Sequence, residues 1–305
     1  MKNIILALAA FVSCMSNLNS QVEPRGTIND YLDAYIGTNA KPYLQPAADL
    51  LTTNINTGVW DWSRINNSFY IKLKANGMLS YPSESMKTFT GHTTGDFTPA
   101  QTAVVPTIIG DEESVLIQSP TNEVYVFPGG FDVDKVTLGT PQLTVGGFLN
   151  MEISGRFLTF PLGHDEGRVD FYGLGGRYSI TSAMDNPPID FSVGYFYHHV
   201  KAGRYVTSNQ HLISAIIGKS GKMLDAHIGI GYQVAMHNLQ YMYQDSDFMY
   251  NVNLDMTNSN PYIVEGGVGL HLGPFMVNGA VSYAKFYTFS LGAGLFFNSR
   301  SKDEE

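Results

Sequence analysis

Six polar side chains in the last third of the chain have the chemistry to bind or transform a ligand. Carboxylates and imidazoles can transfer protons or ligate metals, and amides can orient a bound molecule. The six are Asp225, His227, Gln233, Glu265, His271 and Asn278. Side chains two residues apart on a strand point to the same side, so we expect all six on the inner face of neighbouring strands. There they form either a polar binding track, with a catalytic or metal cluster as its extreme case, or a polar wall satisfied by water.

Alternation of apolar and polar residues identifies the strands that carry these side chains. Large apolar residues alternate with Gly, Ser, His or Glu in residues 224–233, 262–272, 275–283 and 289–297. Segments of about 9–11 residues are long enough to cross a bilayer as tilted strands. A soluble sandwich could also alternate, but outward aromatic residues and small or polar inward residues favour a transmembrane barrel with a polar lumen.

The same alternation predicts the rest of the wall. Further strands are expected near residues 69–79, 141–147, 150–160, 168–182, 189–200 and 208–218. In the first of them Lys72 and Lys74 must face the lumen, because a lysine facing lipid costs about 2–4 kcal/mol near the midplane. Two apolar pieces, residues 103–109 and 115–127, form either an extra hairpin or part of an external loop. Counting them in the wall, we predict an all-β, antiparallel transmembrane β-barrel of about 12 strands, with 10–14 allowed.

The lengths of the connections predict the orientation of the barrel. Turns at residues 148–149, 219–221 and 273–274 are short, and all fall at one end. The connections at the other end include the longest ones: residues 82–138, 161–167, 201–207 and 237–259. Outer-membrane barrels have short periplasmic turns and longer external loops, so we expect this second set outside the cell. The tight turn near residues 285–287 is the exception on that side.

The chain begins with the features of a secretory signal peptide. Lys2, a short apolar run and a small, polar end predict a signal peptide at residues 1–20. Lipidation of Cys14, the single cysteine, is the alternative. No apolar run approaches about 18 residues, which excludes a helical membrane protein. We therefore expect Sec-type export and a location in the bacterial outer membrane.

Residues 21–62 form a separate segment before the predicted barrel. Helical spacing of apolar residues on either side of Pro42 and Pro46 predicts two short helices. We interpret them as a hatch, which either seals the barrel as a lid or gates its lumen. Its main apolar residues are Leu44, Leu51, Ile55 and Trp60. The barrel then spans residues 63–298, and a charged tail follows at residues 299–305.

Composition and motifs limit the classes of function. A net charge of −9 argues against nucleic-acid binding, which needs a basic surface. The sequence has no G-x-S-x-G, H-E-x-x-H or P-loop signature. We therefore predict that the chain is not an enzyme and holds neither a metal nor a cofactor.

The expected external segment from Leu239 to Met256 is unusually rich in aromatic residues and methionine. A dense apolar patch outside the membrane is typical of a binding surface. We predict an entry site for an apolar ligand, formed by Tyr241, Tyr243, Phe248 and Met249. In the alternative, the ends of the segment continue the strands as an aromatic girdle and the rest covers the barrel mouth.

Five short segments occur in order along the chain. They are Tyr43-Leu44-Gln45-Pro46, Asn56-Thr57-Gly58-Val59-Trp60, Pro106-Thr107-Ile108-Ile109-Gly110, Pro141-Gln142-Leu143-Thr144-Val145-Gly146 and Tyr172-Gly173-Leu174-Gly175. Together they resemble an uncharacterised family of outer-membrane barrels from Gram-negative bacteria, itself similar to the FadL-type long-chain fatty-acid transporters. The resemblance implies a hatch, a barrel of up to about fourteen strands and uptake of hydrophobic molecules. Relatives of that type also act as shuttles or scaffolds for secreted proteins. The Asn-Pro-Ala start typical of the transporters is absent, so the fold carries over better than the substrate.

Two hypotheses about function follow, and a third is possible in principle. The first is an outer-membrane barrel, surrounded by lipid, that admits or binds small hydrophobic molecules. The second is a non-transporting barrel that anchors or shuttles a protein partner through residues 82–138 and 237–259. The third, a lipid hydrolase, needs a Ser–His pair near the membrane rim. A lumen open toward the lateral wall would favour transport, whereas a sealed lumen under a large external surface would favour the scaffold.

Overall fold

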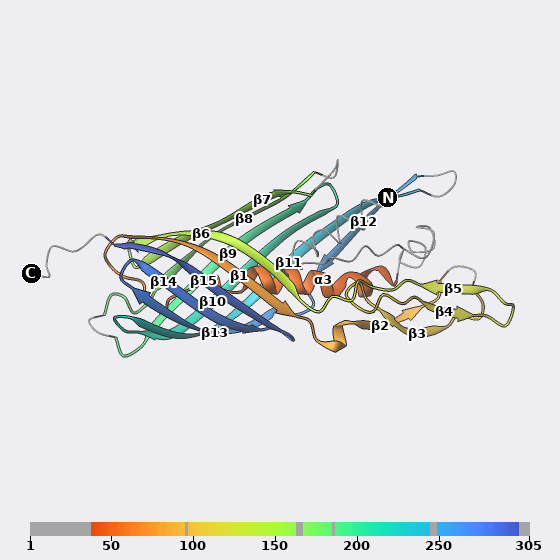
Figure 1. Cartoon of the computed structure of the whole chain (residues 1–305), viewed down its shortest axis with the longest axis horizontal. Helices are drawn as coiled ribbons and strands as arrows, with labels where there is room; N and C mark the ends of the chain where they lie inside the picture. The colour runs from red at the N-terminus through yellow and green to blue at the C-terminus, as the bar shows by residue number, and fades with distance from the viewer. Residues whose placement is uncertain (1–37, 95–96, 163–166, 185–186, 245–248, 299–305) are drawn as a thin grey trace, which may run out of the picture.

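Ten strands close into one antiparallel barrel within the part of the chain that the structure describes. The computed structural model describes residues 38–94, 97–162, 167–184, 187–244 and 249–298 (Figure 1). The strands β1, β6, β7, β8, β9, β10, β11, β13, β14 and β15 follow one another around the wall, and β15 pairs with β1. Their bounds are Tyr70–Tyr81, Val136–Phe148, Met151–Pro161, Arg168–Ser179, Asp190–Ala202, Val206–Ser220, Leu224–Gln244, Tyr262–Leu272, Phe275–Tyr283 and Tyr287–Asn298. The predicted barrel fold is confirmed, and its strands are those that alternation identified.

The described wall has ten strands, the lower limit of the predicted range, rather than the preferred twelve. The two apolar pieces at residues 103–109 and 115–127 contribute to two small sheets that stand apart from the wall. Their strands have only four or five residues, and crossing a bilayer takes about 9–11. These strands and a short 3-10 helix are η1 (Glu84–Met86), β2 (Thr88–His92), β3 (Thr102–Pro106), β4 (Val115–Gln118) and β5 (Val124–Phe127).

The segment expected as a loop at residues 239–256 continues the wall as a hairpin. β11 has 21 residues, and its second half pairs with β12, Met249–Thr257. The first half of β11 pairs with β13. β12 and β13 are therefore two parts of one interrupted strand, with residues 258–261 between them. Figure 1 shows the β11–β12 hairpin projecting beyond the barrel at the end where β2–β5 also lie.

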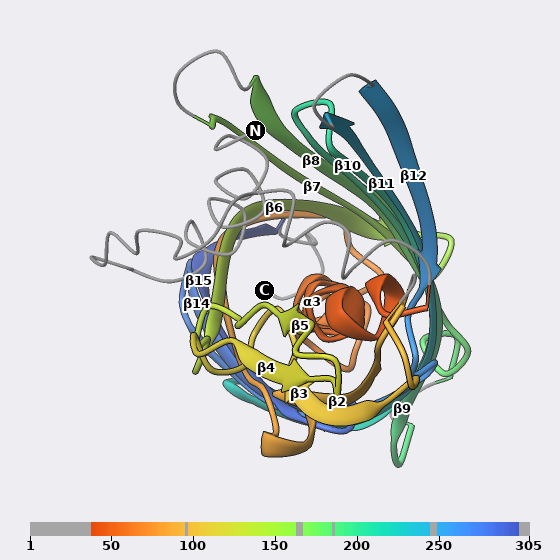
Figure 2. The same cartoon turned by 90° about the vertical axis from the view of Figure 1, so that its right-hand side faces the viewer.

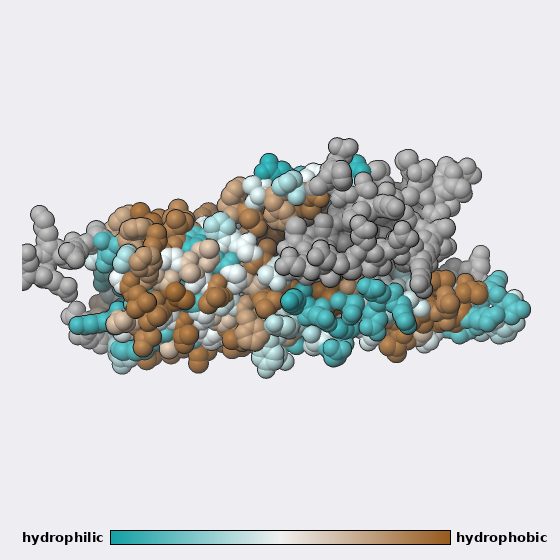
Figure 3. All heavy atoms as spheres, in the orientation of Figure 1, coloured by the Kyte–Doolittle hydropathy of each residue, from teal (hydrophilic) through white to brown (hydrophobic). Residues whose placement is uncertain are grey.

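The wall has an apolar outer face and a mainly polar inner face. Ile228 and Ile230 are 59% and 63% exposed, whereas Asp225 and His227 on the opposite face are buried. Figure 3 shows apolar side chains spread over the outside of the barrel. Lys72 and Lys74 are both 3% exposed and point inward, which confirms the prediction that they face the lumen.

The two ends of the barrel differ in their connections. We call the end with the turns at residues 149–150, 221–223 and 273–274 the short-turn end, and the opposite end, which carries β2–β5 and the β11–β12 hairpin, the long-loop end. Several exposed tyrosines lie at or near strand ends on the long-loop side, as in the aromatic girdles of membrane barrels. They are Tyr81, Tyr262, Tyr283 and Tyr287.

A helix, α3 (Ala40–Asn56), lies inside the barrel near the long-loop end (Figure 2). Its side chains Leu50, Leu51 and Ile55 are buried in an apolar cluster. Inward-facing residues of the wall supply most of the partners: Val136, Val169, Phe171, Val200, Ala202, Val206 and Leu239. The cluster explains why the helix continues through Pro46, although proline removes one backbone hydrogen bond.

Two short helices were predicted for residues 27–62, and residues 40–56 form a single one. Residues 27–37 lie outside the described residues, so the first predicted helix stays a prediction. The assignment of residues 21–62 as one hatch domain also stays a prediction. In the described ranges, no helix has both the length and the apolar character needed to span a membrane.

Placing a charge on the outer face should test the assignment of the two faces. Ile228→Arg is expected to destabilise the inserted barrel by about 2–4 kcal/mol, because Ile228 lies in the apolar outer band. Met223→Arg, at an exposed position in a turn, should cost about 0–1 kcal/mol. Urea unfolding in lipid vesicles measures both values. Equal losses would show that the outer band is not in contact with lipid.

Candidate functional site

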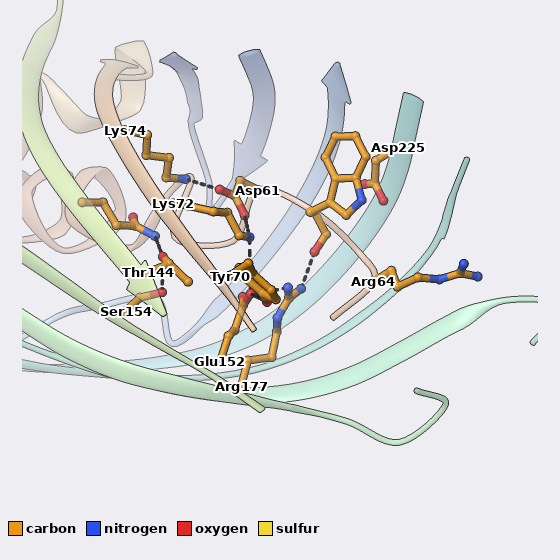
Figure 4. Close-up of polar contacts among 12 residues, drawn as sticks. Asp61, Arg64, Tyr70, Lys72, Lys74, Thr144, Glu152, Ser154, Arg177 and Asp225 are labelled. Atoms are coloured by element: carbon orange, nitrogen blue, oxygen red, sulfur yellow. Dashed lines mark hydrogen bonds and ion pairs between the residues drawn. The ribbon is translucent and has the colours of Figure 1, made fainter. Parts of the chain in front are cut away.

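The lumen below α3 is occupied by the segment that links the helix to β1. We call residues 57–65 the plug. All of them are buried except Arg64, which is half-buried. The plug follows α3 toward the short-turn end, where its last residues contact Asp190, Ser220 and Asp225. Side chains from many wall strands converge on it (Figure 4).

The centre of the plug is held by an ion cluster around Asp61. Its Oδ1 accepts a hydrogen bond from Lys72 Nζ at 2.8 Å, and Lys74 Nζ lies 3.3 Å from its Oδ2. The side chains of all three residues are at most 4% exposed. Removing a single member from such a buried group leaves an uncompensated charge, which is strongly unfavourable. The cluster therefore fixes the plug to β1.

A second carboxylate, Glu152, extends this cluster to β7 and β8. Lys72 Nζ lies 3.3 Å from Glu152 Oε2, and Tyr70 Oη donates to the same oxygen at 2.6 Å. Arg177 Nη2 lies 2.7 Å from Glu152 Oε1 as an ion pair, although its angle is poor for a hydrogen bond. Arg177 Nη1 donates to the carbonyl of Trp62 at 2.6 Å. A charged residue of the wall, Arg177, thus also binds the backbone of the plug.

Arg156 on β7 closes the junction between α3 and the plug. Its Nη1 donates to the carbonyl of Ile55 at 2.8 Å, and its Nη2 donates to the carbonyl of Gly58 at 2.6 Å. The last carbonyls of a helix have no partner within the helix, and a cation there is favourable. Gln142 accepts from Arg156 Nε and donates to the carbonyl of Val59. Arg156 and Gln142 therefore bind three backbone carbonyls at the junction, those of Ile55, Gly58 and Val59.

The six polar residues predicted to line the lumen all have inward-facing positions. Asp225 accepts a hydrogen bond from the backbone N–H of Ser63 at 2.9 Å. Glu265 accepts one from the N–H of Gly58 at 2.8 Å. In both cases a wall carboxylate satisfies a plug donor. These side chains hold the plug, and their role as a ligand track stays a prediction.

The other four residues of the set have different contacts. Gln233 bonds to Asn56 and Thr53 of α3. The ring of His271 lies 4.0 Å from that of Trp62. His227 Nδ1 pairs with Asp225 Oδ1 at 2.9 Å, and Asn278 is buried beside Gly292. The polar wall thus bonds largely to the plug, to α3 and to itself.

The Ser63, Asp225 and His227 side chains are adjacent, but in an order unlike that of a nucleophilic triad. Asp225 lies between them, with Ser63 bonded to one carboxylate oxygen and His227 to the other. A serine nucleophile needs direct contact with the imidazole that takes its proton. Among the described residues, no group of three or more His, Cys, Asp or Glu side chains could hold a metal ion.

The predicted hatch residues lie at two levels of the lumen. Leu51 and Ile55 are core members of the apolar cluster around α3, and Leu44 packs at its edge. Trp60 belongs to a second cluster with Phe196, and its Nε1 donates to Ser214. Leu44, Leu51 and Ile55 therefore lie in the apolar cluster around α3, whereas Trp60 lies in the plug, nearer the short-turn end.

Three of the four residues of the predicted entry site belong to strands. The backbones of Tyr241 and Tyr243 lie in β11 and that of Met249 lies in β12. Phe248 lies outside the described residues. The entry site stays a prediction.

Sequence reasoning missed Asp61, Glu152, Arg156 and Arg177 as parts of the site. The last three occupy alternate positions of wall strands, where the cost of facing lipid requires that a charge point inward. The rule that placed Lys72 could have placed them too. Asp61 carried no such signal, because its role depends on the path of the plug.

The sequence matches one family model, described as "Family of unknown function (DUF6588)", over residues 1–297. No curated protein matches the chain.

Several solved barrels are similar to this chain, with low sequence identities and low TM-scores. Ail of Yersinia pestis, in complex with a heparin analogue, is 9% identical, with 75% of this chain and 99% of that chain covered and a TM-score of 0.28. The translocator domain of NalP from Neisseria meningitidis is 9% identical, with coverage of 87% and 99% and a TM-score of 0.28. The toluene transporter TbuX of Ralstonia pickettii is 10% identical, with coverage of 85% and 94% and a TM-score of 0.23. Values this low do not carry a function over to this chain.

Proposed function

We propose that this chain, which belongs to the DUF6588 family of unknown function, is a closed barrel of the bacterial outer membrane that presents a surface for a protein partner outside the cell. The location is supported by the closed wall, its apolar outer band and the tyrosines near its long-loop end. The long-loop end faces the outside, because external loops are the longer ones in such barrels.

The plug is the observation that carries the proposal of a closed barrel. An open lumen would require the plug to leave its ion cluster, which would break the ion pair between Asp61 and Lys72. It would also break the bonds from Arg156 and Arg177 to backbone carbonyls. A buried charge that is left without its partner costs about 3–5 kcal/mol. A barrel that conducts continuously is therefore not the state this geometry favours.

The proposed external surface consists of the described residues 82–94 and 97–135, which we call the platform. It is fixed to the helix in the lumen. Ile108 N–H donates to the carbonyl of Tyr43, and Tyr43 Oη donates to the carbonyl of Gly129. Asn39 and His92 are joined by two further bonds. The platform is thus held in a defined position relative to the barrel, as a docking surface requires.

The chemistry of the platform predicts the chemistry of its partner. Its described residues include seven exposed carboxylates and two lysines: Glu84, Asp111, Glu112, Glu113, Glu123, Asp132, Asp134, Lys87 and Lys135. A hydrogen bond to Asp134 raises the pKa of Lys87, so that cation is engaged within the platform. Val104, Leu116 and Val124 are 69%, 66% and 56% exposed. A partner that combines basic and apolar side chains would complement this surface. The proposed role is non-enzymatic.

Photo-crosslinking in living cells tests this proposal. A photoreactive phenylalanine analogue at Leu116 should give a discrete protein adduct. The same analogue at Leu174, 61% exposed on the barrel wall, should give lipid adducts alone. Glu112→Lys with Glu113→Lys should reduce the Leu116 adduct several-fold, because like charges would face each other across the interface. If Leu116 gives no protein adduct in cells that display the platform to added protease, the platform is not a docking surface.

A second candidate, admission of small hydrophobic molecules, is favoured by the apolar cluster around α3. Leu50, Leu51 and Ile55 contact an inward face that is apolar near the long-loop end. A hydrophobic ligand would have to replace these contacts and move the helix. Uptake of a panel of apolar compounds by cells with equal surface expression tests this route. If Phe248→Ser with Met249→Ser leaves uptake unchanged, those two residues are not its entry site.

A further inference from the structure

One sector of the outer wall departs from the apolar pattern of the rest. On β8, β9 and β10, between the middle of the strands and the long-loop end, six aromatic or polar side chains face outward: Tyr172, Tyr195, Tyr197, His199, Asn209 and His211. Their direction is fixed by alternation, because Phe196, His198 and Gln210 between them are fully buried. We call these six residues the polar sector.

Five residues of the polar sector are joined by hydrogen bonds, and the ring of Tyr172 stacks on that of His199. Tyr197 Oη donates to Asn209 Oδ1 at 2.8 Å, and His199 Nδ1 lies 2.8 Å from the same oxygen. Tyr195 Oη and His211 Nδ1 lie 2.7 Å apart. The rings are therefore fixed before any ligand arrives, which reduces the ordering cost of binding. The outer nitrogens of the two imidazoles and the amide nitrogen of Asn209 remain available for a bound molecule.

Three cations lie beyond these rings, at the ends of the same strands. Lys201 follows His199 by two residues on the outer face of β9, and Arg204 lies in the turn to β10. Arg168 begins β8, and its carbonyl accepts from Gly203 of that turn at 2.9 Å. All three are exposed. Asp170 pairs with Arg168 at 2.8 Å, so these four described residues, three cations and one carboxylate, carry an excess of about two positive charges.

The remaining wall provides an internal comparison. At the long-loop end of β1, β13, β14 and β15 the outward side chains are Tyr81, Tyr262, Tyr283 and Tyr287. Among the described residues of the tight turn between β14 and β15, Lys285 is the single cation. That side has the composition of an aromatic girdle, whereas the β8–β10 side adds imidazoles, an amide and three cations. A girdle alone does not account for this difference.

We infer that this sector and its three cations bind a phosphorylated glycolipid of the outer leaflet. The cations lie beyond the rings toward the strand ends, as lipid phosphates lie beyond acyl chains, and cations near a membrane surface attract anionic head groups. Tyrosine, histidine and asparagine offer the mixed donors and acceptors that sugar hydroxyls need. Beside them, Leu174 pairs with Tyr197 and Ile213 pairs with Tyr195 in the sheet, and both are exposed apolar side chains for an acyl chain. The inference rests on the proposed outer-membrane location, but not on closure of the lumen or on the platform.

Lipid retention by the purified full chain tests the inference. The probe is lipid A, a diphosphorylated glucosamine lipid, mixed into detergent micelles, and native mass spectrometry counts lipids per barrel. Each cation near an anionic surface strengthens binding roughly fivefold, and Asp170 offsets part of the Arg168 charge. Arg168→Gln, Lys201→Gln and Arg204→Gln together should therefore weaken lipid A binding by at least about 25-fold. Lys219→Gln, Lys222→Gln and Lys285→Gln remove the same charge elsewhere and should leave binding nearly unchanged.

Further arms identify the ligand. Dephosphorylated lipid A should bind as weakly as lipid A binds to the triple variant. Phosphatidylglycerol at the same charge density should bind several-fold less tightly than lipid A, because it lacks the sugars. His199→Phe with His211→Phe keeps the rings and should weaken lipid A but not phosphatidylglycerol. Three results would each overturn the inference. They are an equal loss of lipid A binding in both triple variants, equal binding of lipid A and phosphatidylglycerol, and competition by millimolar inorganic phosphate alone.

Discussion

Replacing Asp61 with alanine is expected to lower the free energy of unfolding of the barrel by about 3–5 kcal/mol. The substitution leaves Lys72 and Lys74 inside the lumen without the carboxylate that both contact. Glu152 lies 3.3 Å from Lys72 and compensates only one of them. Urea unfolding in lipid vesicles, followed by the heat-dependent gel mobility of the folded barrel, measures the loss.

A surface carboxylate provides the control for this experiment. Glu84 is the exposed partner of Lys87, with a side chain 90% exposed and a separation of 3.9 Å. Exposed pairs contribute about 0–1 kcal/mol, so Glu84→Ala should have little effect on unfolding. Similar losses for Asp61→Ala and Glu84→Ala would mean that the ion cluster in the lumen does not stabilise the barrel.

Gly269→Val is expected to displace the plug from the wall. A Cβ atom at Gly269 would lie 2.6 Å from the ring of Trp62 and 3.1 Å from the carbonyl of Asp61. Overpacking of this kind costs about 1–3 kcal/mol, and the segment that can give way is the plug. The two tryptophans of the chain, Trp60 and Trp62, both lie in the plug. Intrinsic fluorescence therefore reports on this segment alone, and its emission should shift to the red with stronger quenching by iodide.

The matched control lies on the same strand. Gly266 is exposed on the outer face of β13, and a Cβ there would meet nothing within 4 Å. Gly266→Val should leave the fluorescence unchanged. If Gly269→Val also leaves it unchanged in a folded barrel, the plug does not pack against β13 as described.

The barrel wall was predictable from the sequence because its signal is local. Alternation along residues 224–233 fixes which side chains share a face, and the cost of charge in lipid fixes that Lys72 points inward. These rules need no knowledge of which strands are neighbours. The inward direction of Asp225 and Glu265 followed from the same rules.

The contents of the lumen were not predictable in this way. Asp61 and Trp62 have no periodic signal. Trp62 is bound by Arg177 on β8, and Glu152 on β7 joins the ion cluster of Asp61 through Lys72, so strands distant in sequence complete the site. The difference in strand count has a related cause. Residues 115–127 alternate like a wall strand, but a turn after Gln118 divides them into pieces too short to cross the membrane.

The current through single barrels in a planar lipid bilayer tests the central claim most directly. The purified full chain should give no steady open level under an applied voltage, because the plug and α3 fill the lumen and are bonded to the wall. Gly269→Val should give open bursts in the same membrane, which shows that the barrel is inserted and that the plug is the barrier. A constant ohmic current through the unmodified chain, with Trp60 and Trp62 still shielded from iodide, would contradict the account of a closed barrel.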